Sequence, residues 1–259
     1  MGVTVADYIA GRSRMYDERK TSGVSRLAVT LSVVSALALA ATGPLHHLGL
    51  FGLMGAFGLL KWSVYGALAA LVLSMVGMLL DARRWVSMRT AATAMILSMV
   101  ATGSLAVIAW KGSRVPAIHD ITTDTIQPPP FLAVLPLRAG ALNPVDYGGP
   151  DVAAKQQQAY PDIAPLLLGV PPGRAFDRAL AAAKAKGWDI VASDPAGGRI
   201  EATDTTFWFG FKDDVVVRVT PLPTGSRVDI RSLSRVGGGD LGANAARIRA
   251  FLTAVKAGS

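Results

Sequence analysis

The chain of 259 residues contains no cysteine and few charged residues, which make up 17% of it against about 25% in an average soluble protein. Without cysteine the protein has no disulfide, no thiolate nucleophile and no cysteine-ligated zinc or iron–sulfur centre. Hydrophobic residues amount to 51%, and the mean hydropathy is +0.39. This composition excludes an intrinsically disordered chain and argues against a wholly soluble protein.

The excess of positive charge is confined to the N-terminal part of the chain. Residues 1–114 contain 11 Lys and Arg against 4 Asp and Glu, a net charge of +7, whereas residues 115–259 contain 15 against 14, a net charge of +1. Because the excess belongs to the hydrophobic part, membrane orientation explains it better than nucleic-acid binding does. We therefore expect the lipid bilayer as a partner, and no nucleic acid.

Three long apolar stretches dominate the first half of the chain, at residues 27–45, 62–80 and 90–110. Each approaches the ~20 residues that a helix needs to cross a ~30 Å hydrocarbon core. Between the first two, residues 47–60 have a glycine at every third position from Gly49 to Gly58. We expect an interfacial or re-entrant segment there, packed through its small residues, with a lipid- or partner-facing groove as the alternative.

Basic residues flank these stretches unequally. Eight lie in the tail over residues 1–26 and in the loop between the second and third stretches, and three lie on the opposite side. The positive-inside rule therefore predicts a cytoplasmic N-terminus, and three crossings place the chain after residue 110 outside the cytoplasm. We expect a multi-pass protein of the bacterial inner membrane with a periplasmic C-terminal domain.

The polar half begins with a proline-rich stretch, residues 111–170, which we expect to be an extended lead-in. Residues 171–259 predict a compact α+β domain, with amphipathic helices over residues 174–186 and 242–256. Counting residues 199–211 as one kinked strand gives about four strands, and their short connections predict an antiparallel sheet with both helices on one face. The strand-like stretches are residues 188–193, 199–203, 207–211, 215–220 and 227–234.

The last two predicted strands contain the densest cluster of polar side chains. Alternation places Arg218, Asp229 and Arg231 on one face and Val228 and Ile230 on the other. As solvent-exposed ion pairs these side chains would contribute only about 0–1 kcal/mol each. As a binding site, their arginines would hold an anionic group. The candidate ligand-binding residues are Arg218, Asp229, Arg231, Arg235, Glu201, Asp213 and Asp214.

Other chemical motifs are weak or missing. The sequence has no nucleophile elbow, P-loop or dinucleotide-binding fingerprint. His46, His47 and His119 fall near the same predicted membrane surface and form a weak alternative metal site. We expect neither a metal nor a cofactor.

Three stretches carry a family resemblance: IHDITTD from Ile118, GRIEATDTTFWFGFKDDVVVRV from Gly198, and VDIRSLSRVGGGDLGANAARIRAFL from Val228. They resemble domain-of-unknown-function family 1499 (DUF1499) over residues 115–257. The resemblance implies a membrane-anchored protein of the bacterial cell envelope and assigns no activity. The positions that match the family pattern are His119, Asp120, Asp124, Glu201, Asp213, Asp214, Arg218, Asp229, Arg231, Ser232, Ser234, Arg235, Asp240 and Arg247.

These observations favour a non-enzymatic membrane protein whose C-terminal domain binds an envelope protein or an anionic or lipidic ligand. A membrane-bound hydrolase or transferase is the first alternative, with Glu201, Asp213 or Asp214 as acid and base, and it requires these groups to converge in a pocket. A small transport or envelope-assembly subunit is the second. Transport is disfavoured because the apolar stretches contain almost no polar residues beyond Ser and Thr.

Overall fold

The computed structural model describes residues 21–82 and 85–258, in two compact units that divide between residues 109 and 110. Most of the predicted cytoplasmic tail, residues 1–20, lies outside the described residues, as do Arg83 and Arg84 of the predicted cytoplasmic loop.

The first unit consists of three long apolar helices, α2 (Gly23–His47), α3 (Leu53–Leu80) and α4 (Trp85–Gly112). Each is long and apolar enough to cross a membrane, which confirms the three predicted apolar helices. The glycine-rich residues 47–60 do not form a separate segment. They comprise the end of α2, a short turn and the first turns of α3, because nothing after Gly52 interrupts the helix.

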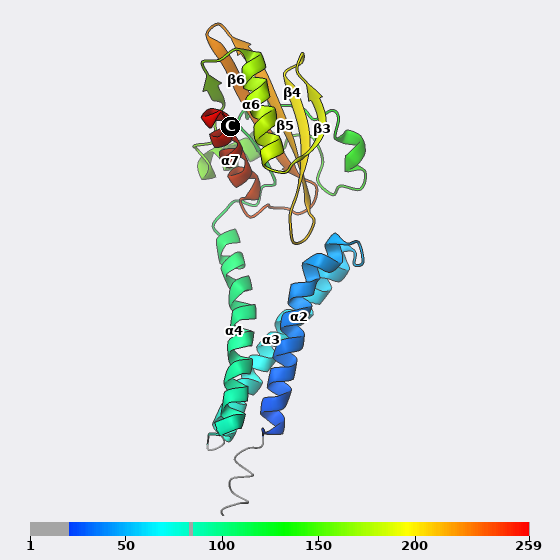
Figure 1. Ribbon diagram of the computed structural model, residues 1–259, viewed down its shortest axis with the longest axis vertical. Helices are drawn as coiled ribbons and strands as arrows, with labels where there is room; N and C mark the ends of the chain where they lie inside the picture. Colours follow the sequence, from blue (N-terminus) through cyan, green and yellow to red (C-terminus); the bar gives the residue numbers. More distant parts are fainter. Residues whose placement is uncertain (1–20, 83–84, 259) are drawn as a thin grey trace, which may run out of the picture. The chain divides into compact units, whose positions relative to one another are not determined.

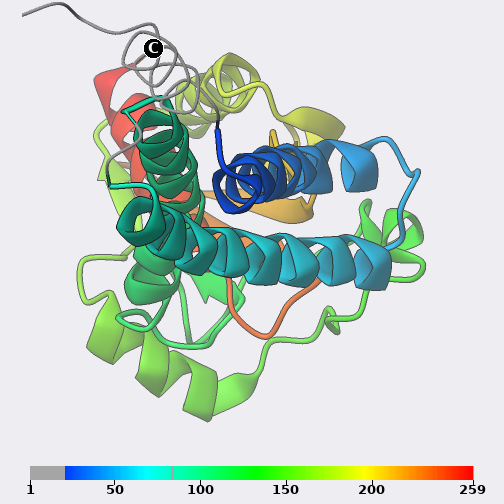
Figure 2. The same cartoon turned by 90° about the horizontal axis from the view of Figure 1, so that it is seen from below.

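The three helices pack through small side chains. In α3 the buried positions alternate in steps of three and four residues from Ser63 to Gly77, the heptad spacing of a left-handed bundle. A methyl group at Gly66 would lie only 2.3 Å from Oγ of Ser35, so α2 and α3 approach closely there, and Figure 2 shows these two helices side by side. The buried residues of α4 are equally small: Ser87, Ala91, Ala94, Ser98 and Ala101.

A buried carboxylate joins the three helices at one end. Asp81, which follows α3 and is 4% exposed, accepts hydrogen bonds through Oδ2 from three serine hydroxyls. Ser25 of α2 donates over 2.9 Å, and Ser22 and Ser87 donate from the starts of α2 and α4. This hydrogen-bond network fixes the helix ends in a bundle that otherwise contains mostly apolar contacts.

The second unit is built on an antiparallel sheet of six strands, which confirms the α+β class but corrects the expected strand number of about four. The spatial order is β1-β6-β5-β4-β3, and the short strand β2 also pairs with β6. The strands are β1 (Asp120–Thr122), β2 (Leu166–Leu168), β3 (Asp189–Asp194), β4 (Arg199–Thr205), β5 (Lys212–Leu222) and β6 (Gly225–Ser234).

The two unpredicted strands lie within residues 111–170, which contain more regular structure than an extended lead-in. β1 and β2 have three residues each, too few for alternation to reveal them. The 3-10 helix η1 (Leu135–Arg138) and helix α5 (Gly149–Ala159) also lie there. By contrast, residues 207–211 are not a strand: Thr206 and Phe211 close a tight turn, and β5 begins at Lys212, three residues before the strand expected at residues 215–220.

Helices α6 (Pro172–Ala185) and α7 (Ala243–Ala257) cover one face of this sheet, as predicted (Figure 1). The main core lies between them and the strands, and Trp188 stacks on Phe251 with ring centroids 5.3 Å apart. Val228 and Ile230 point into this core.

The opposite face is covered by irregular chain, residues 124–148, which we call the cover segment. Phe131 and Val134 of this segment form a second, smaller core with Val216 and Leu233 of the sheet. Around this small core, the covered face consists almost entirely of charged and polar side chains.

The edge of β1 is closed by a side chain. The amide of Gln156 in α5, which is 1% exposed, accepts from the backbone N–H of Thr122 at 3.0 Å and donates to its carbonyl at 2.7 Å. Gln156 thus supplies the hydrogen bonds of a missing neighbouring strand.

Candidate functional site

The polar face predicted from alternation exists, but it lies under the cover segment. Arg218 and Asp229 are direct cross-strand partners, as expected. However, Glu201, Asp214 and Asp229 are each 0% exposed. The expectation of a solvent-exposed lattice is therefore wrong, because the charges face a second layer of chain that the sequence pattern did not reveal.

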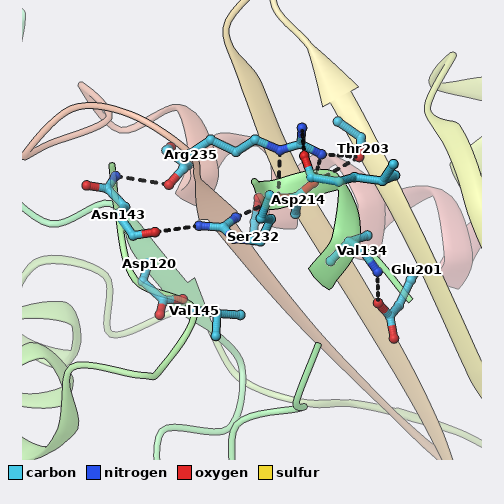
Figure 3. Close-up of polar contacts among 12 residues, drawn as sticks. Asp120, Val134, Asn143, Val145, Glu201, Thr203, Asp214, Ser232 and Arg235 are labelled. Carbon is cyan, nitrogen blue, oxygen red and sulfur yellow. Dashed lines mark hydrogen bonds and ion pairs between the residues drawn. The ribbon is translucent and has the colours of Figure 1, made fainter. Parts of the chain in front are cut away.

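Asp214 is the centre of this buried face (Figure 3). Its carboxylate accepts from Nη1 of Arg138 at 2.5 Å, from Nε and Nη2 of Arg235 at 3.0 and 2.8 Å, and from the hydroxyl of Thr203 at 2.8 Å. Two arginines from different segments therefore share one carboxylate of β5.

Hydrogen bonds and ion pairs of these two arginines fasten the cover segment to the sheet. Arg138 belongs to the cover segment and binds Asp214 of β5, while it also donates within the segment to the carbonyl of Asn143 at 2.9 Å. Arg235, which follows β6, donates to the carbonyl of Leu137 in the cover segment at 2.7 Å. The Asn143 amide nitrogen in turn donates to the carbonyl of Ser234 at 2.9 Å. Cover segment and sheet are thus connected through guanidinium and amide groups rather than by a large apolar interface.

Arg231 forms a bidentate ion pair with Asp120 of β1, at 2.9 and 2.7 Å. Its guanidinium also donates to the carbonyl of Val145 at 2.7 Å and lies 4.9 Å from the ring centroid of Phe131. Burial raises the pKa of Asp120, and the two hydrogen bonds from Arg231 oppose that rise.

Asp229 and Asp124 share two arginines. Arg218 donates to them over 3.0 and 3.1 Å, and Arg227 over 2.9 and 2.7 Å. Burial acts to raise the pKa of Asp124, but the backbone N–H groups of Gln127 and Ile126 and the two arginines outweigh burial and lower the pKa.

Backbone N–H groups of the cover segment bind the carboxylate of Glu201. Its carboxylate accepts from the N–H of Leu132 at 2.9 Å and from the N–H of Val134 at 3.0 Å, both in the cover segment. Arg199 lies 3.5 Å away. Glu201 therefore orders the chain above it.

Asp213 lies on the other side of the sheet from its neighbour Asp214. It accepts from Arg247 of α7 at 2.6 Å, and Arg247 also binds Asp204 at 2.7 Å. The carboxylates that an acid–base mechanism would use do not converge.

Together, the covered face pairs five carboxylates with six arginines in the described part of the chain. Sequence reasoning missed Arg138 and Asn143, since both lie in irregular, proline-rich chain where no periodicity marks a buried face. It found Arg218, Asp229 and Arg231 because alternation in β5 and β6 is regular. It also missed Arg227 of β6, which the same alternation places on this face, and Arg199 of β4.

The three candidate histidines are divided between the two units: His46 and His47 belong to the helical unit and His119 to the sheet unit. Over residues 21–82 and 85–258, no group of three or more His, Asp and Glu side chains is placed to hold a metal ion.

A pocket of about 450 Å3 adjoins the charged face, between the cover segment and α5. The Tyr147 ring lines this pocket and lies 5.6 Å from the guanidinium of Arg231. Burial and the nearby Asp120 carboxylate raise the pKa of Tyr147 to about 12, so its hydroxyl stays protonated. That hydroxyl is buried and has no hydrogen-bond partner among the described residues. The pocket is lined by Thr125, Ile126, Pro128, Tyr147, Gly149, Pro150, Ala153, Ala154 and Gln157.

Comparison with known families identifies the sheet unit. The profile of a family described as "Protein of unknown function (DUF1499)" matches residues 120–255, just over half of the chain. The protein therefore belongs to this family, in a form with three apolar helices before the family domain. No curated protein matches the chain.

Proposed function

We propose that this protein is a non-enzymatic protein of the bacterial inner membrane whose periplasmic domain binds a lipidic ligand with a polar or anionic group. In this proposal the three helices anchor the domain, with the N-terminus in the cytoplasm. Another envelope protein is the alternative partner.

The observation that carries the proposal is the pocket beside Tyr147. Its volume of about 450 Å3 lies in the range typical of small-molecule sites. Ile126, Pro128 and Ala153 give it an apolar wall, whereas the Tyr147 hydroxyl is a buried donor that has no acceptor among residues 21–82 and 85–258. A molecule with an apolar body and one accepting oxygen would match both features.

The arrangement of charges argues against the hydrolase or transferase alternative. Asp214 is already bound by Arg138 and Arg235, Glu201 by backbone N–H groups, and Asp213 lies on the opposite face. An acid–base pair needs two such groups aimed at one substrate atom in an open pocket.

The test is to fill the pocket. Ala154 lines the pocket and is exposed, so Ala154→Trp should occupy the cavity without unfolding α5. Gln158→Trp, four residues further along the same helix at an exposed position outside the pocket lining, is the matched control. The full chain is purified in mild detergent, and co-purifying lipids are identified by native mass spectrometry.

The proposal expects a lipid on the wild-type protein and on Gln158→Trp, and its loss from Ala154→Trp. Unchanged bound lipids in Ala154→Trp would refute the pocket as the binding site.

A second experiment tests the enzyme alternative in a strain that lacks the gene. There the isosteric variant Asp213→Asn should restore the wild-type phenotype in proportion to the amount of folded protein. A folded but wholly inactive Asp213→Asn would favour the enzyme alternative.

A further inference from the structure

The turn between β4 and β5, Thr206–Phe211, presents four aromatic residues in a row of six. Phe207 is 94% exposed, an unusual position for a phenylalanine. Phe209 stacks on Phe211 with centroids 4.9 Å apart, and Trp208 meets Phe209 edge-on at 5.1 Å. The turn contains no charged residue. We call these six residues the aromatic tip.

Three of the six backbone N–H groups of the aromatic tip donate hydrogen bonds within the turn itself. The N–H of Thr206 donates to the carbonyl of Phe211 at 2.8 Å, and the N–H of Phe211 donates to the Thr206 hydroxyl at 2.8 Å. The N–H of Gly210, which has a φ of 69°, donates to the carbonyl of Thr206 at 2.9 Å. These three N–H groups would therefore keep their hydrogen bonds if the turn entered an apolar medium.

Strand register places the aromatic tip at a defined end of the sheet. β5 begins at Lys212, directly after the tip, and Asp213 pairs with Ser234 at the end of β6. The N–H of Ser234 donates to the carbonyl of His119, immediately before β1. The aromatic tip and the start of β1 therefore share one end of the sheet.

That end is also the one to which the last apolar helix connects. α4 ends at Gly112 and β1 begins at Asp120, so at most ~29 Å of chain joins them. The β5–β6 turn lies at the far end of the 10 residues of β6, about 34 Å further away. Trp110, whose ring lies 3.8 Å below the Arg114 guanidinium, marks the end of the apolar stretch with a residue pair typical of membrane interfaces.

We propose that the aromatic tip inserts into the interfacial region of the same bilayer that α4 crosses, and so gives the sheet unit a second attachment to the membrane. Clustered Trp and Phe side chains on a charge-free turn suit the boundary between head groups and acyl chains. The inference concerns a surface separate from the pocket, and it holds whichever ligand the pocket takes.

Because the chain contains no cysteine, a single introduced cysteine can be labelled specifically. Phe207→Cys introduces one thiol at an almost fully exposed position, and Thr224→Cys does the same in the exposed β5–β6 turn as the matched control. Each full-length variant is labelled with a nitroxide. It is then placed, one chain per nanodisc, in phosphatidylethanolamine and phosphatidylglycerol. Collision rates with oxygen and with a water-soluble nickel chelate are measured by electron paramagnetic resonance.

The proposal expects a ratio of oxygen to nickel collisions several-fold higher at position 207 than at position 224. Equal ratios at the two positions would place the tip in water and overturn it. A label at position 207 that is shielded from both reagents would lie against protein, which also overturns it. Retention of the near-ultraviolet circular dichroism of the wild type is the folding control for both variants.

Discussion

Replacing Asp214 with asparagine would keep the shape of the side chain and remove the charge that holds two arginines. Side chains of Arg138 and Arg235 are only 5% and 14% exposed, and that of Asp214 is 0% exposed. Water therefore cannot replace the lost carboxylate, and both guanidinium groups would stay buried without a full counter-charge.

Breaking a buried ion pair by removing one partner costs about 3–5 kcal/mol. For a unit of about 150 residues, each kcal/mol lowers Tm by ~2–4 °C, so Asp214→Asn should lower it by about 6–20 °C. Adding Arg138→Met should recover part of the loss, because it removes one of the two stranded charges. Unfolding of the purified protein in detergent, followed by near-ultraviolet circular dichroism, measures both changes.

Asp162 offers the matched control. It also binds one arginine in a bidentate pair, Arg249 at 2.5 and 2.7 Å, but the two side chains are 54% and 44% exposed. Asp162→Asn should therefore cost about 1 kcal/mol or less. Equal losses for Asp162→Asn and Asp214→Asn would refute the reasoning, because burial would then make no difference to the free energy of these pairs.

Three further outcomes are expected. A reporter that is active only outside the cytoplasm should be active when fused after the last residue and silent within residues 81–88, and the reverse pattern would contradict the orientation. Because the pKa of Asp124 is lowered below its usual 3.8 in the folded state, its charge stabilises the fold above that pH and loses this effect as the pH falls through the folded-state pKa. The difference in unfolding free energy between the wild type and Asp124→Asn should thus be constant above about pH 5 and shrink in acid, and a difference that grows in acid would contradict the sign. Gln156→Ala should cost about 1–3 kcal/mol and speed hydrogen exchange at the Thr122 amide, whereas unchanged exchange would mean that the Gln156 amide does not close the edge of β1.

The regular parts of the fold could be predicted because their sequence signals extend over many residues. The three apolar helices are long apolar runs, α6 and α7 repeat an amphipathic pattern over several turns, and β6 alternates charged and apolar residues from Arg227 to Arg231. β1 and β2 could not be found in this way. Their three residues become strands only through pairing with β6, which is a tertiary effect.

The sequence predicted which strand residues share the candidate site, but it did not predict that they are buried. Alternation correctly grouped Arg218, Asp229 and Arg231, since it depends only on the geometry of one strand pair. Whether that face meets water depends on the path of residues 124–148, which have no period of their own. A face rich in both arginine and aspartate looks the same in sequence whether it is exposed or covered.

The cover segment also sets an order of events during synthesis. Asp120 precedes its partner Arg231 by 111 residues, and at ~5–20 residues per second the ribosome needs roughly 5–20 s to add them. The cover segment is therefore made well before the face that it covers is complete. The charged layer can close only after β6, the last strand, has been made. A chain interrupted before β6 would thus retain every apolar helix of the first unit and yet be unable to assemble the charged layer of the second.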